Sequence, residues 1–264
     1  MSSRPRIALC GATGRTGNAV AHALVARDDV DLVALVAPSV ATTPSRALPD
    51  GVPAFATLTE AIEAGGIDVI VDLTHAGPAL EHLELALAAR IPVVVGATGF
   101  DDGELESIGA RFKTEGLGVF LVPNFSLGAV LAMRVAEQLA AHFPDVEVVE
   151  THHDGKRDAP SGTAVHTARR IAAARRDAGL AAGIAADTAG ESRSRGESIE
   201  GVAVHALRLP GATAHQEVVF GAPGELLTIR HDAIDRSCYA AGVALAARGV
   251  TDMQGLETGL EHVL

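Results

Sequence analysis

The chain is poor in aromatic side chains. It has 264 residues, no tryptophan and one tyrosine, and aromatic residues make up only 3% of it, whereas apolar residues as a whole make up 48%. Its core must therefore be assembled mainly from Ala, Val, Leu and Ile. Small aliphatic side chains let helices lie close against a sheet, so this composition favours a layered fold of alternating strands and helices.

Cysteine is scarce, and long apolar runs are missing. Cys10 and Cys238 are far apart and have no metal-type spacing, so we interpret both as small buried side chains rather than as a disulfide framework. No apolar run reaches the ~18 residues of a membrane span. The first run, Ile7–Cys10, is too short for the core of a signal peptide. We therefore expect a cytoplasmic protein with no membrane partner.

Positive charge is also in short supply. The chain has 21 Lys and Arg residues against 33 Asp and Glu, a formal net charge of −12. This balance disfavours nucleic acid or an anionic membrane as a partner on electrostatic grounds. An anionic substrate would need a local basic pocket within this negative field.

The first half of the sequence alternates short apolar runs with helical patterns. Thr57 with Glu60 three residues later predicts a capping box, Pro78 predicts the start of a helix, and Asp101 or Asp102 predicts a helix cap. Apolar runs without alternation are typical of strands buried on both faces of a parallel sheet. The expected strands are Ile7–Cys10, Asp31–Val36, Ile67–Leu73, Ile91–Gly96 and Leu117–Val122. The rhythm predicts an α/β fold with a Rossmann-type doubly wound parallel sheet over residues 1–124.

The pattern changes after Asn124. Ser126 predicts the start of one helix, and a second helix is expected from Ser161 to about Arg176. Strands are expected at Val146–His152, Val202–Arg208, His215–Phe220 and Glu225–His231, and the polar stretch Asp187–Glu200 is expected to be a loop. Residues 125–234 are therefore predicted to form a second, α+β domain for substrate binding and oligomerisation. The C-terminal segment 235–264 is predicted to be helical and to pack back on the first domain.

A glycine-rich segment directly follows the first strand. Gly11, Gly14 and Gly17 are spaced Gly-x-x-Gly-x-x-Gly, and such a turn lets the backbone amides of a helix start approach a pyrophosphate. Taken alone, the spacing is a weak signal, because an ordinary tight strand-to-helix turn is the alternative. Its place as the first βα turn of a parallel sheet favours dinucleotide binding.

A second segment, residues 152–163, gathers protonatable side chains at the end of a strand. His152, His153 and Lys156 precede a Pro-Ser-Gly-Thr helix start, whose free amides can hold a carboxylate. Protonatable groups beside an anion site suit a reaction that adds hydride and a proton to an anionic imine. The alternative is that the histidines merely end a strand and that Lys156 is solvated. The two histidines do not predict a metal site, because neighbouring residues on a strand point to opposite faces.

The segment Glu150–Ala164 resembles the signature of the 4-hydroxy-tetrahydrodipicolinate reductase (dihydrodipicolinate reductase) family. The resemblance extends over nearly the whole chain, and includes Gly11–Gly17, Asp72–His75, Gly96–Phe100, Pro123–Ser126 and the stretch from His205 to Asp235.

The resemblance implies that the chain uses NADPH or NADH to reduce the cyclic imine formed from 4-hydroxy-tetrahydrodipicolinate to tetrahydrodipicolinate, a step of diaminopimelate and lysine biosynthesis. It implies that His152 is the proton donor and Lys156 a second catalytic residue. The substrate, a small anionic dicarboxylate, would contact His153, Ser161, Gly162 and Thr163. The dinucleotide would contact Gly11, Ala12, Thr13, Gly14, Arg15, Thr16, Gly96, Ala97, Thr98, Val122, Pro123, Asn124 and Phe125. A homotetramer, assembled through the sheet of the second domain, is also implied.

The chain departs from the family pattern near the expected cofactor. Ala37 stands where an acidic residue usually holds the adenosine ribose, and Leu73, Thr16 and Ala97 replace the common Phe, Met and Thr. The choice between NADPH and NADH is therefore open. Two other functions also remain open. One is a paralogue that reduces another cyclic imine, with substrate choice altered by residues such as Arg208 or Arg195. The other is a non-catalytic dinucleotide-binding protein of the same fold.

Overall fold

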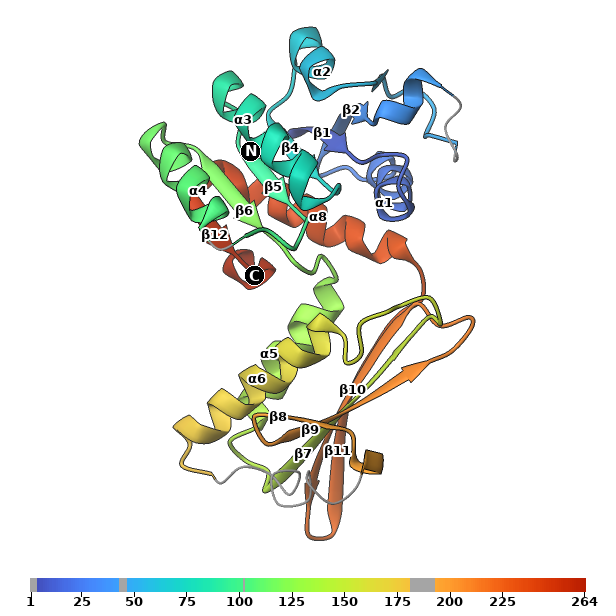
Figure 1. Ribbon diagram of the computed structural model, residues 1–264, viewed down its shortest axis with the longest axis vertical. Coiled ribbons are helices and arrows are strands. Elements are labelled where there is room, and N and C mark those ends of the chain that lie inside the picture. Colours follow the sequence, from blue (N-terminus) through green and yellow to red (C-terminus); the bar gives the residue numbers. More distant parts are fainter. Residues whose placement is uncertain (1–3, 43–46, 102, 181–192) are drawn as a thin grey trace. The chain divides into compact units, whose positions relative to one another are not determined.

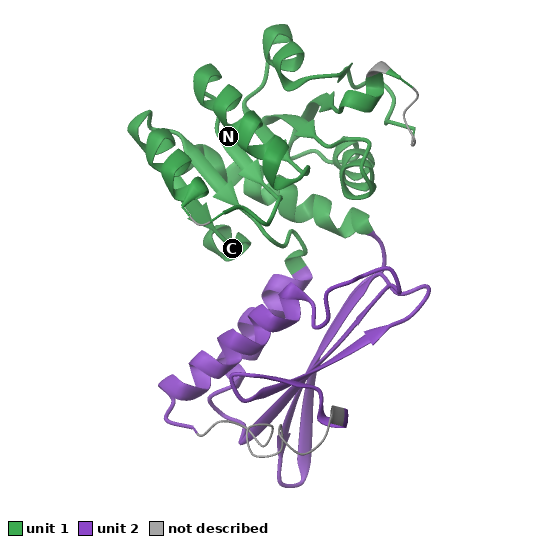
Figure 2. Ribbon diagram, in the orientation of Figure 1, with its two compact units in different colours: residues 1–127, 236–264 green, residues 128–235 purple. Residues whose placement is uncertain are grey.

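The computed structural model describes residues 4–42, 47–101, 103–180 and 193–264, and the chain divides into two compact units. The first contains residues 1–127 and 236–264, and the second contains residues 128–235 (Figure 2). The second domain was expected from the sequence to contain residues 125–234. No helix in the described part of the chain is long and apolar enough to cross a membrane.

The first unit is built on a seven-stranded sheet in which every pair of neighbouring strands is parallel (Figure 1). The strand order is β12-β6-β5-β4-β1-β2-β3. Its strands are β1 (Arg6–Cys10), β2 (Asp31–Val36), β3 (Ala54–Phe55), β4 (Val69–Asp72), β5 (Val93–Val95), β6 (Gly118–Leu121) and β12 (Gly255–Thr258). The predicted Rossmann-type sheet is thus confirmed, although β3 and β12, two short edge strands, were not predicted.

Helices cover both faces of this sheet. The helices are α1 (Arg15–Val25), α2 (Leu58–Ala64), α3 (Ala76–Ala89), α4 (Glu104–Thr114) and α8 (Tyr239–Gly249). In β1, Ala8 and Cys10 belong to the core formed with α2, α3 and α4, whereas α1 packs on α8. The buried Ile7 and Leu9 alternate with Ala8 and Cys10, so β1 is buried on both faces as its continuous apolar run predicted.

Local signals placed several helix ends correctly and two wrongly. The Thr57–Glu60 capping box is present at the start of α2. Gly103, with φ of 87°, is the N-cap of helix α4, where Asp101 or Asp102 was expected; Asp102 lies outside the described residues. Helix α3 begins at Ala76, so Pro78 lies in its first turn, two residues later than its start. Proline is tolerated in a first turn because the amide it lacks has no intrahelical partner there.

The second unit has a five-stranded mixed sheet in the order β11-β10-β7-β9-β8 (Figure 1). The strands are β7 (Asp145–His152), β8 (Glu197–Ile199), β9 (Val202–Arg208), β10 (Ala214–Ala222) and β11 (Glu225–Ala233). Helices α5 (Leu127–Leu139) and α6 (Gly162–Asp177) pack on one face, where Val146 and Val148 of β7 join their core. The α+β class of this unit is confirmed.

The expected loop at Asp187–Glu200 is wrong at its end. Residues 187–192 lie outside the described residues, but Arg193–Arg195 forms a short 3-10 helix and β8 pairs with β9. Cys10 is buried as expected, whereas Cys238, in the short 3-10 helix before α8, is partly exposed.

Candidate active site

The glycine turn of the first unit joins the end of β1 to the start of α1. Gly11 has φ of 82°, and a Cβ atom there would lie 2.8 Å from the Leu73 carbonyl oxygen. A Cβ at Gly17 would collide with the Gly11 carbonyl oxygen. Glycine is therefore required at both positions for the chain to turn this tightly.

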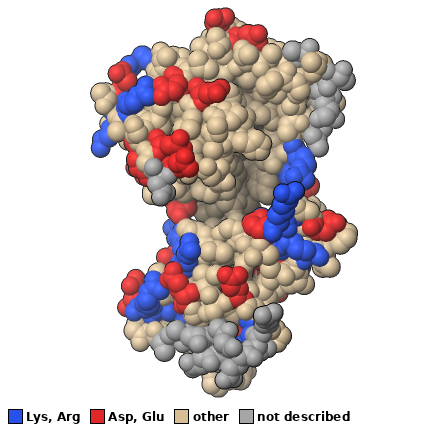
Figure 3. All heavy atoms as spheres, viewed as in Figure 1, with Lys and Arg blue, Asp and Glu red and all other residues tan. Residues whose placement is uncertain are grey.

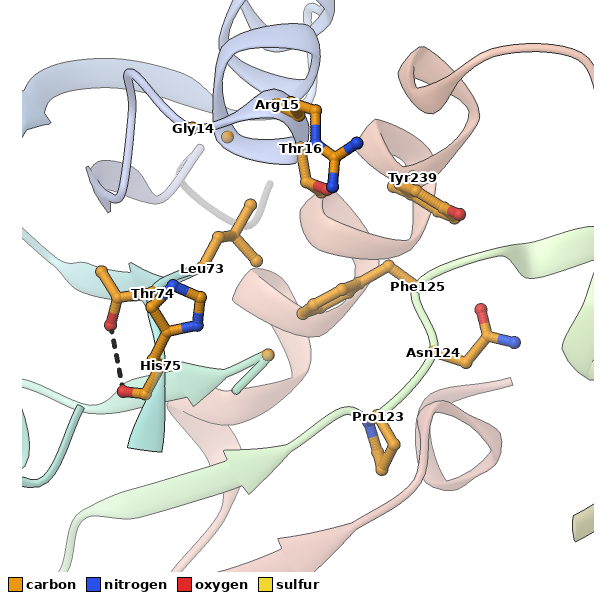
Figure 4. A pocket seen from close by; sticks show the side chains of 12 residues that line it. Gly14, Arg15, Thr16, Leu73, Thr74, His75, Pro123, Asn124, Phe125 and Tyr239 are labelled. Atoms are coloured by element: carbon orange, nitrogen blue, oxygen red, sulfur yellow. Dashed lines mark hydrogen bonds between the residues drawn. The ribbon is translucent and has the colours of Figure 1, made fainter. Parts of the chain in front are cut away.

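The start of α1 opens on a pocket of about 550 Å³ (Figure 4). Its N-cap, Gly14, has no side chain to cap the first-turn amides, and no acidic residue lies in that turn. The positive end of the helix dipole is thus available to an anion, and the exposed Arg15 adds a full positive charge. The pocket therefore offers a site for an anion.

The pocket brings together about half of the residues expected to bind the dinucleotide. Those that line it are Gly14, Arg15, Thr16, Gly96, Pro123, Asn124 and Phe125. Of the others, Ala12, Ala97 and Val122 are buried, Thr98 lines a neighbouring pocket, and Gly11 and Thr13 lie in the glycine turn itself.

Five further lining residues were not among those expected to contact the dinucleotide: Gly17, Leu73, Thr74, His75 and Tyr239. Tyr239, at the start of α8, comes from the far end of the chain and is the only tyrosine (Figure 4). No sequence pattern shows that Tyr239 shares a pocket with the glycine turn, because the two are far apart in the chain. The one available signal was that it is the only tyrosine. Burial raises the pKa of this phenol above its usual value.

A buried carboxylate holds the loop that lines this pocket. Asp72, at the end of β4, is fully buried and accepts hydrogen bonds from the Thr74 amide (2.8 Å) and from Nδ1 of His82 (2.6 Å). The Thr74 hydroxyl donates to the same Asp72 oxygen as the Thr74 amide. These bonds fix the direction in which Leu73, Thr74 and His75 leave the strand.

Among the described residues, Cys10, Asp72 and His82 form one group of side chains close enough to share a metal ion. Both oxygens of Asp72 already accept hydrogen bonds. Burial, and to a lesser extent the Asp72 charge, raises the pKa of the Cys10 thiol well above its usual value, which keeps it protonated. We therefore assign this group to the hydrogen-bonded support of the pocket loop.

In the second unit, the end of β7 and the start of α6 bring the predicted catalytic segment together. His152 is the last residue of β7, and a turn follows in which the Lys156 amide donates to the His153 carbonyl oxygen at 3.1 Å. Helix α6 begins at Gly162 with Ser161 as its N-cap. The Ser161 hydroxyl is buried and accepts from the Ala164 amide at 3.3 Å, so this side chain caps the helix. Its expected contact with substrate stays a prediction.

His152 lies against two kinds of charge. Its Nδ1 is 2.6 Å from Oε2 of Glu150, which is fully buried. Burial lowers the pKa of His152 below its usual value; Glu150 opposes this shift, and the positive charges of Lys156 and Arg208 add to it. Glu150 itself loses solvation on burial, but hydrogen bonds from Arg208, His152 and the Ser161 amide outweigh that loss and lower its pKa.

The two arginines considered for substrate choice lie on opposite faces of the sheet. Arg208 donates to both oxygens of Glu150, at 2.9 and 2.8 Å, on the face covered by α5 and α6. Arg195 pairs with Glu147, which is an odd number of residues from Glu150 on β7 and so faces the other way. Of the two, only Arg208 belongs to the His152 site.

The first unit thus has the sheet and the glycine turn typical of a dinucleotide-dependent oxidoreductase, and the second brings an imidazole and an ammonium close to a helix start. Residues 5–125 match the family described as "Dihydrodipicolinate reductase, N-terminus", and residues 128–264 match "Dihydrodipicolinate reductase, C-terminus". The chain belongs to the dihydrodipicolinate reductase family, whose members are NADH- or NADPH-dependent reductases.

Full-length relatives and a solved structure agree with this assignment. The 4-hydroxy-tetrahydrodipicolinate reductase of Nocardia farcinica is 44% identical over 260 residues, covering 98% of each chain. The enzyme of the same name from Lysinibacillus sphaericus is 38% identical over 264 residues, covering 98% of this chain and 99% of its own. The structure of dipicolinate-bound dihydrodipicolinate reductase from Paenisporosarcina sp. TG-14 superposes with a TM-score of 0.85 at 36% identity, covering 99% of this chain and 100% of that one.

Proposed function

We propose that this chain reduces the cyclic imine formed from 4-hydroxy-tetrahydrodipicolinate to tetrahydrodipicolinate in the diaminopimelate route to lysine. The observation that carries the proposal is the placement of His152 and Lys156 beside the start of α6, in a chain whose other unit carries a dinucleotide turn. A non-catalytic dinucleotide-binding protein would need no such proton donor.

The second unit would bind the substrate and supply the proton. The first-turn amides of α6, at Gly162 and Thr163, together with Lys156 and His153, would hold the substrate carboxylates. His152 would deliver the proton through Nε2, since its Nδ1 already faces Glu150. NADPH or NADH, bound at the glycine turn, supplies the hydride, so that one hydride and one proton are added to the conjugated ring.

One assay separates this function from its alternatives. The freshly made condensation product of pyruvate and aspartate semialdehyde is added to the enzyme, and NAD(P)H oxidation is followed by absorbance. Rapid oxidation that requires the condensation product supports the proposal. Turnover with other cyclic imines alone would point to a paralogue, and cofactor binding without turnover of any imine would point to a non-catalytic protein.

The face of the second sheet that is turned away from α5 and α6 suits the assembly of a homotetramer. A hollow of about 430 Å³ on it is lined by Val149, Thr151, Leu207 and His215 among others, and Leu207 is 41% exposed. Apolar residues on a sheet face that no helix covers are typical of subunit interfaces.

Nucleic acid is not expected as a partner. Figure 3 shows both acidic and basic side chains on the face in view, whereas a nucleic-acid surface is mainly basic.

Analytical ultracentrifugation tests this assembly. We expect the purified chain to sediment as a tetramer and Leu207→Asp to sediment as a smaller species. Leu131→Asp is the matched control, because Leu131 on α5 is 44% exposed but lies away from the sheet. A monomeric chain, or equal dissociation of both variants, would contradict the proposed interface.

A further inference from the structure

The buried carboxylate of Glu150 connects three parts of the candidate site. It lies two residues before His152 on β7, so both side chains leave the strand on the same face. Besides its contact with the ring of His152, it accepts hydrogen bonds from the guanidinium of Arg208 on β9 and from the backbone amide of Ser161 at 3.1 Å. One fully buried group thus sets the position of the expected proton donor and of the helix start that would bind the substrate carboxylate.

The contact with Glu150 determines which nitrogen of His152 carries its proton. An ionised carboxylate only accepts hydrogen bonds, so Nδ1 keeps its proton in both states of the ring. The proton that is donated is the second one, which Nε2 carries in the imidazolium. Arg208 keeps Glu150 ionised through its paired bonds, and it also donates to the Asp158 carbonyl oxygen at 2.6 Å. The arginine therefore links the carboxylate to the turn that carries Lys156.

Three charged groups act directly on His152 within the described part of the chain. Glu150 on β7 favours the imidazolium, and Arg208 on β9 and Lys156 in the following turn disfavour it. Asp158 partly neutralises Lys156 through an ion pair at 2.8 Å. The residue opposite His152 on β10 is Ala214, and Ser161 at the start of α6 carries no charge.

We propose that Glu150 is a positioning residue for proton transfer: it holds the His152 ring with Nδ1 protonated and Nε2 toward the substrate, while Arg208 holds Glu150 ionised. This inference rests on the proposed function, in which His152 donates the proton. Removing the carboxylate would leave the imidazole free to rotate or to change tautomer, and the imidazolium would lose its counter-charge.

The test compares Glu150→Gln with Arg208→Gln in the full-length enzyme, through pH profiles of kcat and kcat/KM. We expect E150Q to lower kcat about 10- to 100-fold, with KM for the imine changed only a few-fold. An acid that must be protonated loses activity as pH rises through its pKa. The alkaline fall in activity should therefore move to lower pH in E150Q, which removes a negative charge from His152, and to higher pH in R208Q, which removes a positive one.

Because the alkaline fall in activity should shift in opposite directions in E150Q and R208Q, the pair distinguishes a positioning role from general damage to the fold. Glu137→Gln is the matched control, because it breaks a carboxylate–arginine pair with Arg170 in the same unit, and Glu137 is not among the groups that act on His152. Its pH profile and kcat should equal those of the unchanged enzyme. Titration of the His152 ring by NMR gives the same comparison without turnover, and its pKa should fall in E150Q and rise in R208Q.

Three outcomes would overturn the inference: unchanged kcat in E150Q, shifts of both variants in the same direction, or lower rates with no shift in either. If E150Q does not fold, R208Q and the shorter Glu150→Asp decide. R208Q must still shift the alkaline fall in activity to higher pH, and E150D must keep this fall near that of the unchanged enzyme at reduced kcat.

His152→Gln distinguishes an error in the assigned proton donor from an error in the role of Glu150. Full activity in H152Q would refute the assigned proton donor, whereas a large loss in H152Q with none in E150Q would refute only the role of Glu150.

Discussion

The ammonium group of Lys156 lies 2.8 Å from a carboxylate oxygen of Asp158, two residues along the same turn. This ion pair lowers the pKa of Asp158, and the Gly162 amide at the start of α6 contributes in the same direction. A carboxylate of the chain itself thus lies beside the cation and the helix start that would bind the substrate. The Asp158 side chain is 56% exposed, so it can move aside.

Asp158→Asn should strengthen substrate binding. The variant removes a negative charge that repels the dicarboxylate and competes for Lys156, and we expect KM for the imine to fall about 3- to 10-fold with kcat nearly unchanged. Initial-rate kinetics at low ionic strength measure this. Asp154→Asn, in the same turn but without an ion pair to Lys156, should leave KM unchanged. A higher KM in D158N would show instead that Asp158 holds Lys156 in its working position.

Lys156→Ala and His152→Ala should impair turnover far more than cofactor binding. Each removes a group that donates a proton or stabilises charge, an effect typically worth about 10²–10⁴ in rate. Cofactor affinity should stay within a few-fold of the unchanged enzyme. It can be followed through quenching of the Tyr239 emission, because the chain has no tryptophan and this single tyrosine lines the pocket at the glycine turn. Lys113→Ala, on α4 of the other unit, serves as the control. Near-normal turnover in K156A would refute its catalytic role.

Planar dicarboxylates should inhibit competitively against the imine. If the α6 amides hold one carboxylate and Lys156 with His153 assists, pyridine-2,6-dicarboxylate should bind well. Pyridine-2-carboxylate lacks one of the two carboxylates and should bind at least about tenfold more weakly, because a charge-assisted hydrogen bond contributes roughly 1.5 kcal/mol or more. Inhibition constants for the pair measure the difference. Equal inhibition by both compounds would exclude a clamp for two carboxylates.

The parts of the fold that could be predicted from sequence were those set by local chemistry. Strands such as Asp31–Val36 and Val202–Arg208 are continuous apolar or alternating runs, and Thr57 and Ser161 are caps whose hydrogen bonds are local. Strand β12 was missed because its four residues lie largely exposed at a sheet edge and carry no apolar run. The Gly103 cap was missed because a left-handed cap at a helix start is uncommon, whereas aspartate is the usual residue there.

The candidate site shows the same division between local and distant relationships. The spacing of Glu150 and His152 on one strand is enough to place both side chains on one face. No local pattern predicts that Arg208, which is 58 residues farther along, completes the group, because this depends on β9 pairing with β7. Tyr239 joins the dinucleotide pocket in the same way, because the C-terminal helix returns to the first unit.

The choice of nicotinamide cofactor is the remaining prediction, and it rests on the loop after β2. An acidic residue there would accept hydrogen bonds from the ribose and repel a 2′-phosphate, but here the strand runs into Ala37. Ser39 donates to the Thr13 hydroxyl at 2.8 Å, which ties this loop to the glycine turn near Arg15, while Arg46 lies outside the described residues.

We expect kcat/KM to be higher with NADPH than with NADH, or similar with both. Arg15→Ala should lower kcat/KM for NADPH about tenfold more than for NADH, because a guanidinium–phosphate contact contributes roughly 1.5 kcal/mol. Steady-state kinetics of both proteins with both cofactors supply the four values needed. A clear preference for NADH in the unchanged enzyme would show that the missing carboxylate does not control the choice. Equal losses for both cofactors in R15A would place Arg15 at the pyrophosphate, which the two cofactors share.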